Sequence, residues 1–207
     1  MTVRFEFFFD ISSPWTWLAF HNVQPLAERL GVAVIWRPIL VGGVFNAINP
    51  SVYEFRKHPV PAKARYVAKD LTDWAAASGL LINWPPSVFP LNSARLMRAC
   101  LVADDHGVLP DFAGRAFAAY WTGDRDISQD AELTRLAEAA GLDGPATLEM
   151  TRQPAQKERL RANTTELIDR GGFGSPTMFV DGGDMYFGND RLCLVERALS
   201  ARLSPPG

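Results

Sequence analysis

The first 36 residues constrain the fold most, because their pattern fits a strand, a helix and a second strand in that order. Residues 3–9 are apolar and aromatic apart from two alternating charges, which predicts a strand leading into a core. Ser13-Pro14 then opens a helix over residues 15–30, since serine can cap a helix and proline is tolerated in its first turn. Gly31 ends this helix, and residues 32–36 predict a strand. The two strands are expected to pair in parallel, because a helix connects them.

The middle of the chain predicts helices rather than strands. Helical segments are expected at about residues 62–78, 92–105, 111–121, 129–140 and 145–152. Two long loops are expected, a polar one at 42–61 and an aromatic, proline-rich one at 80–91. Long loops of this kind in a compact domain are usually functional or disordered.

The C-terminal part returns to mixed α/β structure. A helix is predicted at about 154–170, two strands of a hairpin at 177–180 and 185–187, and a last helix from 188–190 to about 199. Removing the helical middle leaves the βαβ…αββα order of a thioredoxin-like fold. We therefore expect one α/β domain formed by residues 1–37 and 154–207, with a large all-helical insertion at 38–153.

Composition excludes several classes of function. The 207 residues carry a net charge of -2 with both signs scattered, so no basic face for nucleic acid is expected. No run of about 18 uncharged apolar residues is available to span a bilayer, and no signal peptide is recognised. Cys100 and Cys193 form no spaced motif, and the three histidines are isolated, so a cytoplasmic protein without a metal site is expected.

The segment FFFDISSPWTWLAF resembles the start of DsbA-like thioredoxin folds, in which a Cys-Pro-x-Cys element begins the first helix. The matching tetrad here is Ser13-Pro14-Trp15-Thr16. Both cysteine positions hold hydroxyl residues, so dithiol–disulfide exchange is chemically impossible at this site. The Ser-Pro-aromatic form resembles the kappa-class glutathione transferases and the 2-hydroxychromene-2-carboxylate isomerases. Further segments that carry the resemblance are RPILVGGVF, PAKARYVAKDL, FPLNSARLMRA, GFGSPTMFVDG and FGNDRL.

The resemblance implies glutathione as cofactor and Ser13 as the catalytic residue. A helix N-terminus favours an anion, and the glutathione thiol, with an ordinary pKa of about 8.5, needs only modest help to ionise at neutral pH. A serine hydroxyl can donate a hydrogen bond to that sulfur. Ser13 could instead be only an N-cap, and Ser12 is the neighbouring alternative. Pro14 and Trp15 complete the expected contacts at this position.

Two later segments are implied to bind the rest of glutathione. Ser175-Pro176 occupies the place of the cis-proline loop, where the main chain of Ser175 can pair with an extended peptide. Asn189 and Asp190 would hold the glutamyl end, Asp190 by pairing with its ammonium. The simpler alternatives are a turn proline at 176 and an N-cap at Asn189.

A loop asparagine and several substrate contacts complete the expected site. Asn49 is the candidate loop ligand, but Asn46 is a rival because the spacing is shorter by one residue. Trp84 could form a wall for a flat aromatic substrate, or be structural. Further candidates to attract a carboxylate, each also compatible with an ordinary surface position, are Arg37, Lys63 and Tyr66.

The resemblance implies a glutathione-dependent isomerase of aromatic-compound degradation. The thiolate would add reversibly to a conjugated carbon, rotation would follow, and elimination would restore the thiol. A kappa-like transferase that conjugates glutathione to an electrophile is the alternative, and a non-catalytic glutathione- or peptide-binding module is a third possibility. A small-molecule aromatic or electrophilic substrate and a homodimer are expected partners.

Overall fold

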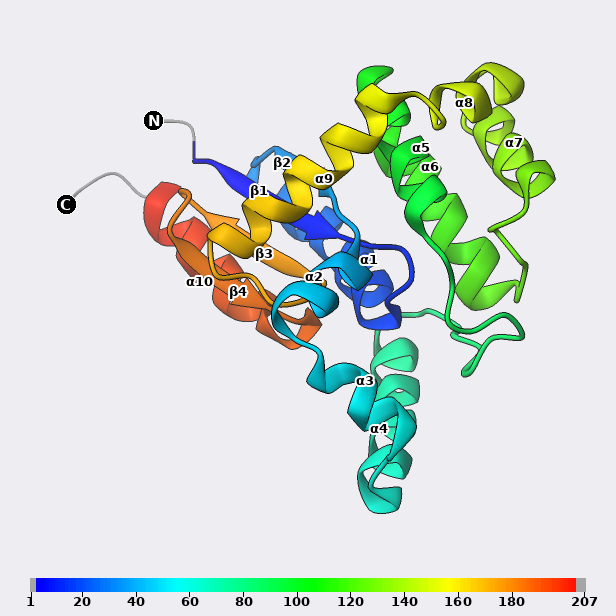
Figure 1. Cartoon of the computed structure of the whole chain (residues 1–207). Helices are drawn as coiled ribbons and strands as arrows, with labels where there is room; N and C mark the ends of the chain where they lie inside the picture. The colour runs from blue at the N-terminus through cyan, green and yellow to red at the C-terminus, as the bar shows by residue number, and fades with distance from the viewer. Residues whose placement is uncertain (1–2, 204–207) are drawn as a thin grey trace.

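A four-stranded mixed sheet lies at the centre of the structure, a computed structural model that describes residues 3–203 (Figure 1). Its order is β2-β1-β3-β4, with bounds β1 Phe5–Phe9, β2 Val34–Pro38, β3 Thr177–Val180 and β4 Asp184–Phe187. β1 pairs in parallel with β2 and antiparallel with β3, and β3 and β4 form the antiparallel hairpin. The predicted parallel pairing and hairpin are both confirmed.

β1 is buried on both faces, which explains its nearly continuous aromatic sequence. Phe5, Phe7 and Phe9 face the larger core, which α1 (Pro14–Leu30), α5 (Ala94–Asp105), α6 (Leu109–Phe117) and α10 (Leu192–Leu203) help to form. Phe8 faces the other side, where it packs in a smaller cluster with residues of α2 (Val41–Ile48) and α9 (Pro154–Asp169). The sheet is therefore covered by helices on both faces (Figure 1).

The remaining helices lie around this centre. They are α3 Ser51–Lys57, α4 Pro61–Ala77, a π-helical turn at Ala118–Thr122, α7 Asp130–Ala139, α8 Gly144–Met150 and a 3-10 turn at Asn189–Arg191. In Figure 1, α3 and α4 extend below the rest of the chain, while α7 and α8 lie beside α5 and α6. None of the helices within residues 3–203 is both long and apolar enough to cross a membrane.

The helical middle shares its core with the βαβ unit. Buried residues of α5, α6 and α7 belong to the same hydrophobic cluster as β1 and α1. The predicted boundaries at 37/38 and 153/154 stay a prediction, and residues 1–2 and 204–207 lie outside the described residues.

The predicted loop at 42–61 is wrong, because this segment forms α2, α3 and the first residue of α4. Val41 and Val44 are buried, and α2 packs beside Thr164 of α9 at Gly43. The carboxylate of Asp10 accepts a hydrogen bond from Val41 N at 2.8 Å and so holds the start of α2. Tertiary packing thus overrides the low helix propensity of the Gly42-Gly43 pair. The predicted loop at 80–91 is confirmed, since it holds neither helix nor strand.

Candidate functional site

Ser13 caps α1 and also reaches the loop before β3. Its Oγ accepts a hydrogen bond from Thr16 N at 3.3 Å and donates one to the Ser175 carbonyl at 3.3 Å. The N-cap interpretation is therefore confirmed. Both bonds are longer than the usual range, so the hydroxyl is held weakly and can turn to another partner.

Ser175 joins three segments of the site. Its Oγ accepts a hydrogen bond from Asp10 N at 2.9 Å and lies 2.8 Å from Thr16 Oγ1. The Ser175–Pro176 peptide bond is cis, as the resemblance implies. Thr16, which occupies the second cysteine position of the tetrad, is completely buried. Of the two cysteine positions of the tetrad, only the first, Ser13, is thus partly exposed.

Asp10 fixes the loop that leads to Ser13, and the sequence analysis did not single it out. The carboxylate is fully buried and accepts hydrogen bonds from Ser12 N, Val41 N and Ser93 Oγ at 2.8–2.9 Å. Burial raises the pKa of Asp10, and these hydrogen bonds offset only part of the rise. An acidic residue directly after a largely aromatic strand is the signal that could have identified it.

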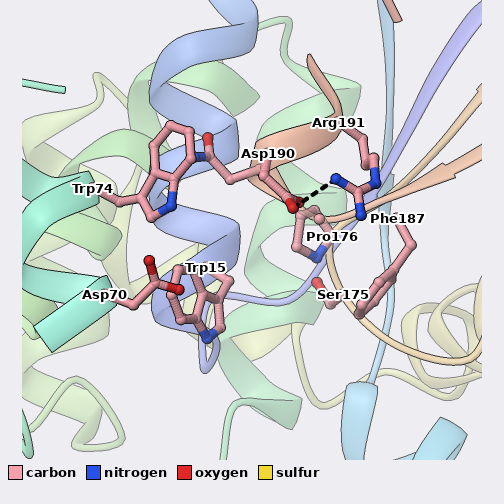
Figure 2. A pocket seen from close by; sticks show the side chains of 10 residues that line it. Trp15, Asp70, Trp74, Ser175, Pro176, Phe187, Asp190 and Arg191 are labelled. Atoms are coloured by element: carbon pink, nitrogen blue, oxygen red, sulfur yellow. Dashed lines mark hydrogen bonds and ion pairs between the residues drawn. The ribbon is translucent and has the colours of Figure 1, made fainter. Parts of the chain in front are cut away.

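One cavity of about 340 Å³ lies beside the start of α1. Its lining, most of it labelled in Figure 2, is Trp15, Asp70, Trp74, Ser175, Pro176, Phe187, Gly188, Asn189, Asp190 and Arg191. This first cavity brings together most of the predicted glutathione contacts, although they come from three distant segments. Figure 2 shows Trp15, Asp70 and Trp74 on one side and Asp190, Arg191 and Phe187 on the other. Asp70 and Trp74, on α4, were not predicted.

Asn189 carries an unpaired donor at the first cavity. Its side chain is 4% exposed, and its Oδ1 accepts a hydrogen bond from Asn22 Nδ2 at 3.0 Å. Its own Nδ2 is buried and has no hydrogen-bond partner in the described part of the chain. The N-cap alternative for Asn189 is wrong, because Gly188 takes the cap position of the 3-10 turn. A buried donor without a partner is costly, so the site favours a ligand that supplies an acceptor.

The neighbouring Asp190 is exposed and pairs with Arg191, their charged atoms lying 2.7 Å apart. Asp70 lines the same cavity and is half-buried. The cavity therefore offers two carboxylates and one guanidinium to a ligand that carries charges of both signs.

A second cavity, of about 320 Å³, lies on the other side of the Ser13 loop. Its lining is Ser12, Leu40, Val41, Gly42, Gly43, Phe45, Asn46, Tyr53, Arg56, Phe89, Pro90, Leu91, Asn92 and Ser93. Ser12 lines this cavity and Trp15 lines the first. Ser13 and Pro14 lie between these two residues in the sequence and line neither cavity themselves.

Of the two loop asparagines, the structure brings Asn46 to the second cavity. Its Oδ1 accepts a hydrogen bond from the Tyr53 hydroxyl at 2.9 Å. Asn49 instead donates to the Phe173 carbonyl at 3.2 Å and accepts from Ser51 Oγ. Asn49 lines neither cavity.

The four residues predicted to contact substrate also line neither cavity. Arg37 pairs with Glu166 of α9 and lies over the ring of Phe8, on the sheet face that α9 covers. Arg37 is therefore not part of the candidate site. Tyr66 is 63% exposed, and Lys63 lies over the exposed ring of Phe55.

Trp84 has a structural role, because it packs against aromatic residues beside the second cavity. Its ring stacks on Trp121, with 6.0 Å between centroids, and contacts Phe89 edge-on. Trp121 Nε1 in turn donates to the Ile11 carbonyl at 2.8 Å. The aromatic loop is thereby connected to the segment that precedes Ser13.

The fold and the Ser-Pro start of α1 define the class of protein. Residues 4–200 match the DSBA-like thioredoxin domain, and the chain belongs to that family. The DsbA of Pseudomonas aeruginosa shares this fold, with a TM-score of 0.59 and 16% identity over 98% of this chain and 87% of that chain.

Within the family, the chain belongs with the 2-hydroxychromene-2-carboxylate isomerases and the kappa-class glutathione transferases. It is 33% identical to the 2-hydroxychromene-2-carboxylate isomerase of Sphingobium xenophagum, over 96% of this chain and 99% of the relative. Human glutathione S-transferase kappa 1 is 26% identical, over 97% of this chain and 92% of the relative. A solved structure of a 2-hydroxychromene-2-carboxylate isomerase has a TM-score of 0.83 and 28% identity, covering 99% of this chain and all of that chain. The chain is thus an enzyme of the isomerase or glutathione transferase type.

Proposed function

We propose that this protein is a glutathione-dependent isomerase of the 2-hydroxychromene-2-carboxylate type, acting in aromatic-compound degradation. The observation that carries the proposal is the position of Ser13. Its hydroxyl bonds the Ser175 carbonyl at the first cavity, while the preceding residue lines the second cavity. A sulfur held at Ser13 would face a ligand on each side of the loop.

The first cavity suits the ends of a glutathione molecule. The unpaired Nδ2 of Asn189 can donate to a carboxylate, and Asp190 and Asp70 can pair with an ammonium. The indole rings of Trp15 and Trp74 offer apolar walls to the rest of the tripeptide. The fit rests on the Asn189 Nδ2 donor, which no group in residues 3–203 satisfies.

Bound glutathione would supply the thiolate, which adds to a conjugated carbon, allows rotation about the resulting single bond and then leaves. Ser13 contributes by turning its hydroxyl from the Ser175 carbonyl to the sulfur and donating a hydrogen bond to it. The N-terminus of α1 contributes its partial positive charge at the same place. Both contributions favour the anionic sulfur over the neutral thiol.

The second cavity suits the acceptor. The rings of Phe45 and Phe89 form apolar walls for a flat conjugated molecule, and Asn46 offers an amide beside them. Ser93 and Val41, which line this cavity, are also hydrogen-bonded to the buried Asp10. The acceptor site and the Ser13 loop are therefore held by the same carboxylate.

The direct test is the isomerisation of 2-hydroxychromene-2-carboxylate, followed by its absorbance with and without glutathione. Turnover that requires glutathione is the expected result. Binding of glutathione without any turnover would overturn the substrate assignment, and would favour a binding module. No binding of glutathione would overturn the use of the first cavity as well.

A kappa-type transferase is the second candidate, supported by the similarity to human glutathione S-transferase kappa 1. The residues described above would serve it equally, because thiolate addition is common to both reactions. The two differ in what is released. Mass spectrometry of the products separates them, since an isomerase returns free glutathione and a transferase releases a stable adduct.

The resemblance also carries two predictions about the whole molecule, a homodimer and a cytoplasmic location. Light scattering coupled to size exclusion tests the first, and fractionation of the source cells tests the second.

A further inference from the structure

The second cavity contains a single charged side chain among the described residues that line it, the guanidinium of Arg56. The other polar groups there are neutral hydroxyls and amides. A cavity whose only charge is positive favours an anionic occupant. This preference for an anion adds to the preference of the aromatic walls for a flat molecule.

Two rings of the cavity hold the Arg56 guanidinium. Its central carbon lies 5.8 Å from the ring centroid of Phe45 and 5.7 Å from that of Phe89. Contacts of this kind keep the cation at the cavity wall without neutralising it. The head group of a long exposed side chain is thus kept where an acceptor would lie.

Arg56 also lacks an acidic partner. Nowhere in residues 3–203 does a carboxylate form an ion pair with it, although α3 carries Glu54. Glu54 lies toward Lys57, with 3.5 Å between Oε1 and Nζ. The charge of Arg56 is therefore available to a ligand.

We infer that Arg56 is the specificity-determining residue of the second cavity, where it pairs with the carboxylate of a conjugated acceptor. A planar guanidinium can bind a carboxylate through two parallel hydrogen bonds. The rings of Phe45 and Phe89, which contact the same guanidinium, then lie beside the acceptor's own conjugated plane. The inference rests on the proposed function, and it narrows the substrate class to conjugated carboxylates over neutral electrophiles.

The test compares two probes of nearly equal shape, cinnamate and cinnamamide, at a pH where the acid is ionised. Their binding is measured by isothermal titration, with and without S-methylglutathione, which lacks a free thiol. The wild type is expected to bind cinnamate at least tenfold more tightly than the amide. Arg56→Gln is expected to remove that preference, and Arg56→Lys to keep part of it.

Lys57→Gln is the matched control, because it removes the same charge from the same helix at a residue outside the cavity. It is expected to keep the preference for cinnamate. The inference is overturned if the wild type shows no preference, if Arg56→Gln keeps it, or if Lys57→Gln removes it equally. The binding readout needs no turnover, so failure of the proposed isomerase activity stays a separate result. Far-ultraviolet circular dichroism verifies that each variant is folded.

Discussion

Replacing Ser13 with alanine isolates what its hydroxyl does at a bound sulfur. In the structure the hydroxyl makes two hydrogen bonds, both of 3.3 Å, to Thr16 N and to the Ser175 carbonyl. Because both are long, little stabilisation opposes its turning to a thiolate. Ser13→Ala is therefore expected to affect the thiolate more than the fold.

The size of the effect follows from the negative charge of the thiolate, which accepts the hydrogen bond from Ser13. A hydrogen bond to a charged group contributes about 1.5–3 kcal/mol. Since one pKa unit corresponds to about 1.4 kcal/mol, its loss raises the pKa of the bound thiol by about 1–2 units. Below both pKa values the thiolate fraction, and with it the turnover rate, falls about 10–100-fold. Above the variant's pKa both enzymes hold thiolate, and their rates converge.

The assay is the ultraviolet absorbance of the bound thiolate against pH, with turnover measured in the same buffers. Thermal unfolding accompanies it, because loss of an N-cap costs about 0.5–2 kcal/mol of stability. Ser12→Ala is the control, since Ser12 lines the second cavity and its backbone amide bonds Asp10. It is expected to leave the thiol pKa unchanged.

The result that refutes this reasoning is a Ser13→Ala variant whose bound thiol titrates as in the wild type. Its turnover would then fall equally at every pH, or not at all. In that case Ser13 is an N-cap only, and the sulfur is stabilised by the helix terminus alone.

Three further predictions concern other parts of the site and its support. Asn189→Ala removes the unpaired buried donor and is expected to weaken glutathione binding at least about tenfold; equal affinities in isothermal titration would contradict this. Trp121→Phe leaves the Ile11 carbonyl without its donor and is expected to lower the free energy of unfolding by about 1–3 kcal/mol, as denaturant titration measures. Burial raises the pKa of Glu6, but the hydrogen bonds from Arg170 and Arg4, together with their positive charges, outweigh it, so the folded pKa lies below its usual value. The stability this gives is present above the unfolded pKa and is lost as pH falls through the folded pKa, and Glu6→Gln should flatten that acid-side decline in thermal unfolding.

Local patterns were enough to predict the N-terminal βαβ unit and the C-terminal hairpin. The alternation around Phe7 and the Ser13-Pro14 cap depend only on neighbouring residues, and such signals survive folding unchanged. The same holds for Ser13 itself, whose capping role the structure confirms. The lining residues of the first cavity that were predicted came from resemblance rather than from local physics; they are Trp15, Ser175, Pro176, Asn189 and Asp190.

Helix α2 could not be predicted in this way. Its Gly42-Gly43 pair has low helix propensity. The helix is instead stabilised by packing of Val44 against α9 and by the hydrogen bond from the Val41 backbone amide to the distant Asp10. Asp70 and Trp74 were missed for a related reason. They lie on α4, more than 50 residues beyond Trp15 in the sequence, and no local pattern marks them as part of the same cavity.

The strand β2 was predicted correctly, but the structure does not bring its Arg37 to either cavity. It lies opposite Phe8 in the parallel register, and Phe8 faces the side of the sheet that α9 covers. The period of two along a strand would have placed Arg37 there if the register had been known. Without that register, the positive charge of Arg37 was the only basis for predicting that it binds a substrate carboxylate.

The replacement of both tetrad cysteines changes how the site would withstand oxidants. Cys100 is buried, and burial raises the pKa of its thiol well above the usual value, so it resists attack by peroxide. At the tetrad the chain offers only the hydroxyls of Ser13 and Thr16, and Thr16 is enclosed. On the proposed mechanism the reactive sulfur belongs to a ligand that dissociates after use. An oxidised sulfur would then leave by exchange with a fresh glutathione, and the tetrad itself would need no repair.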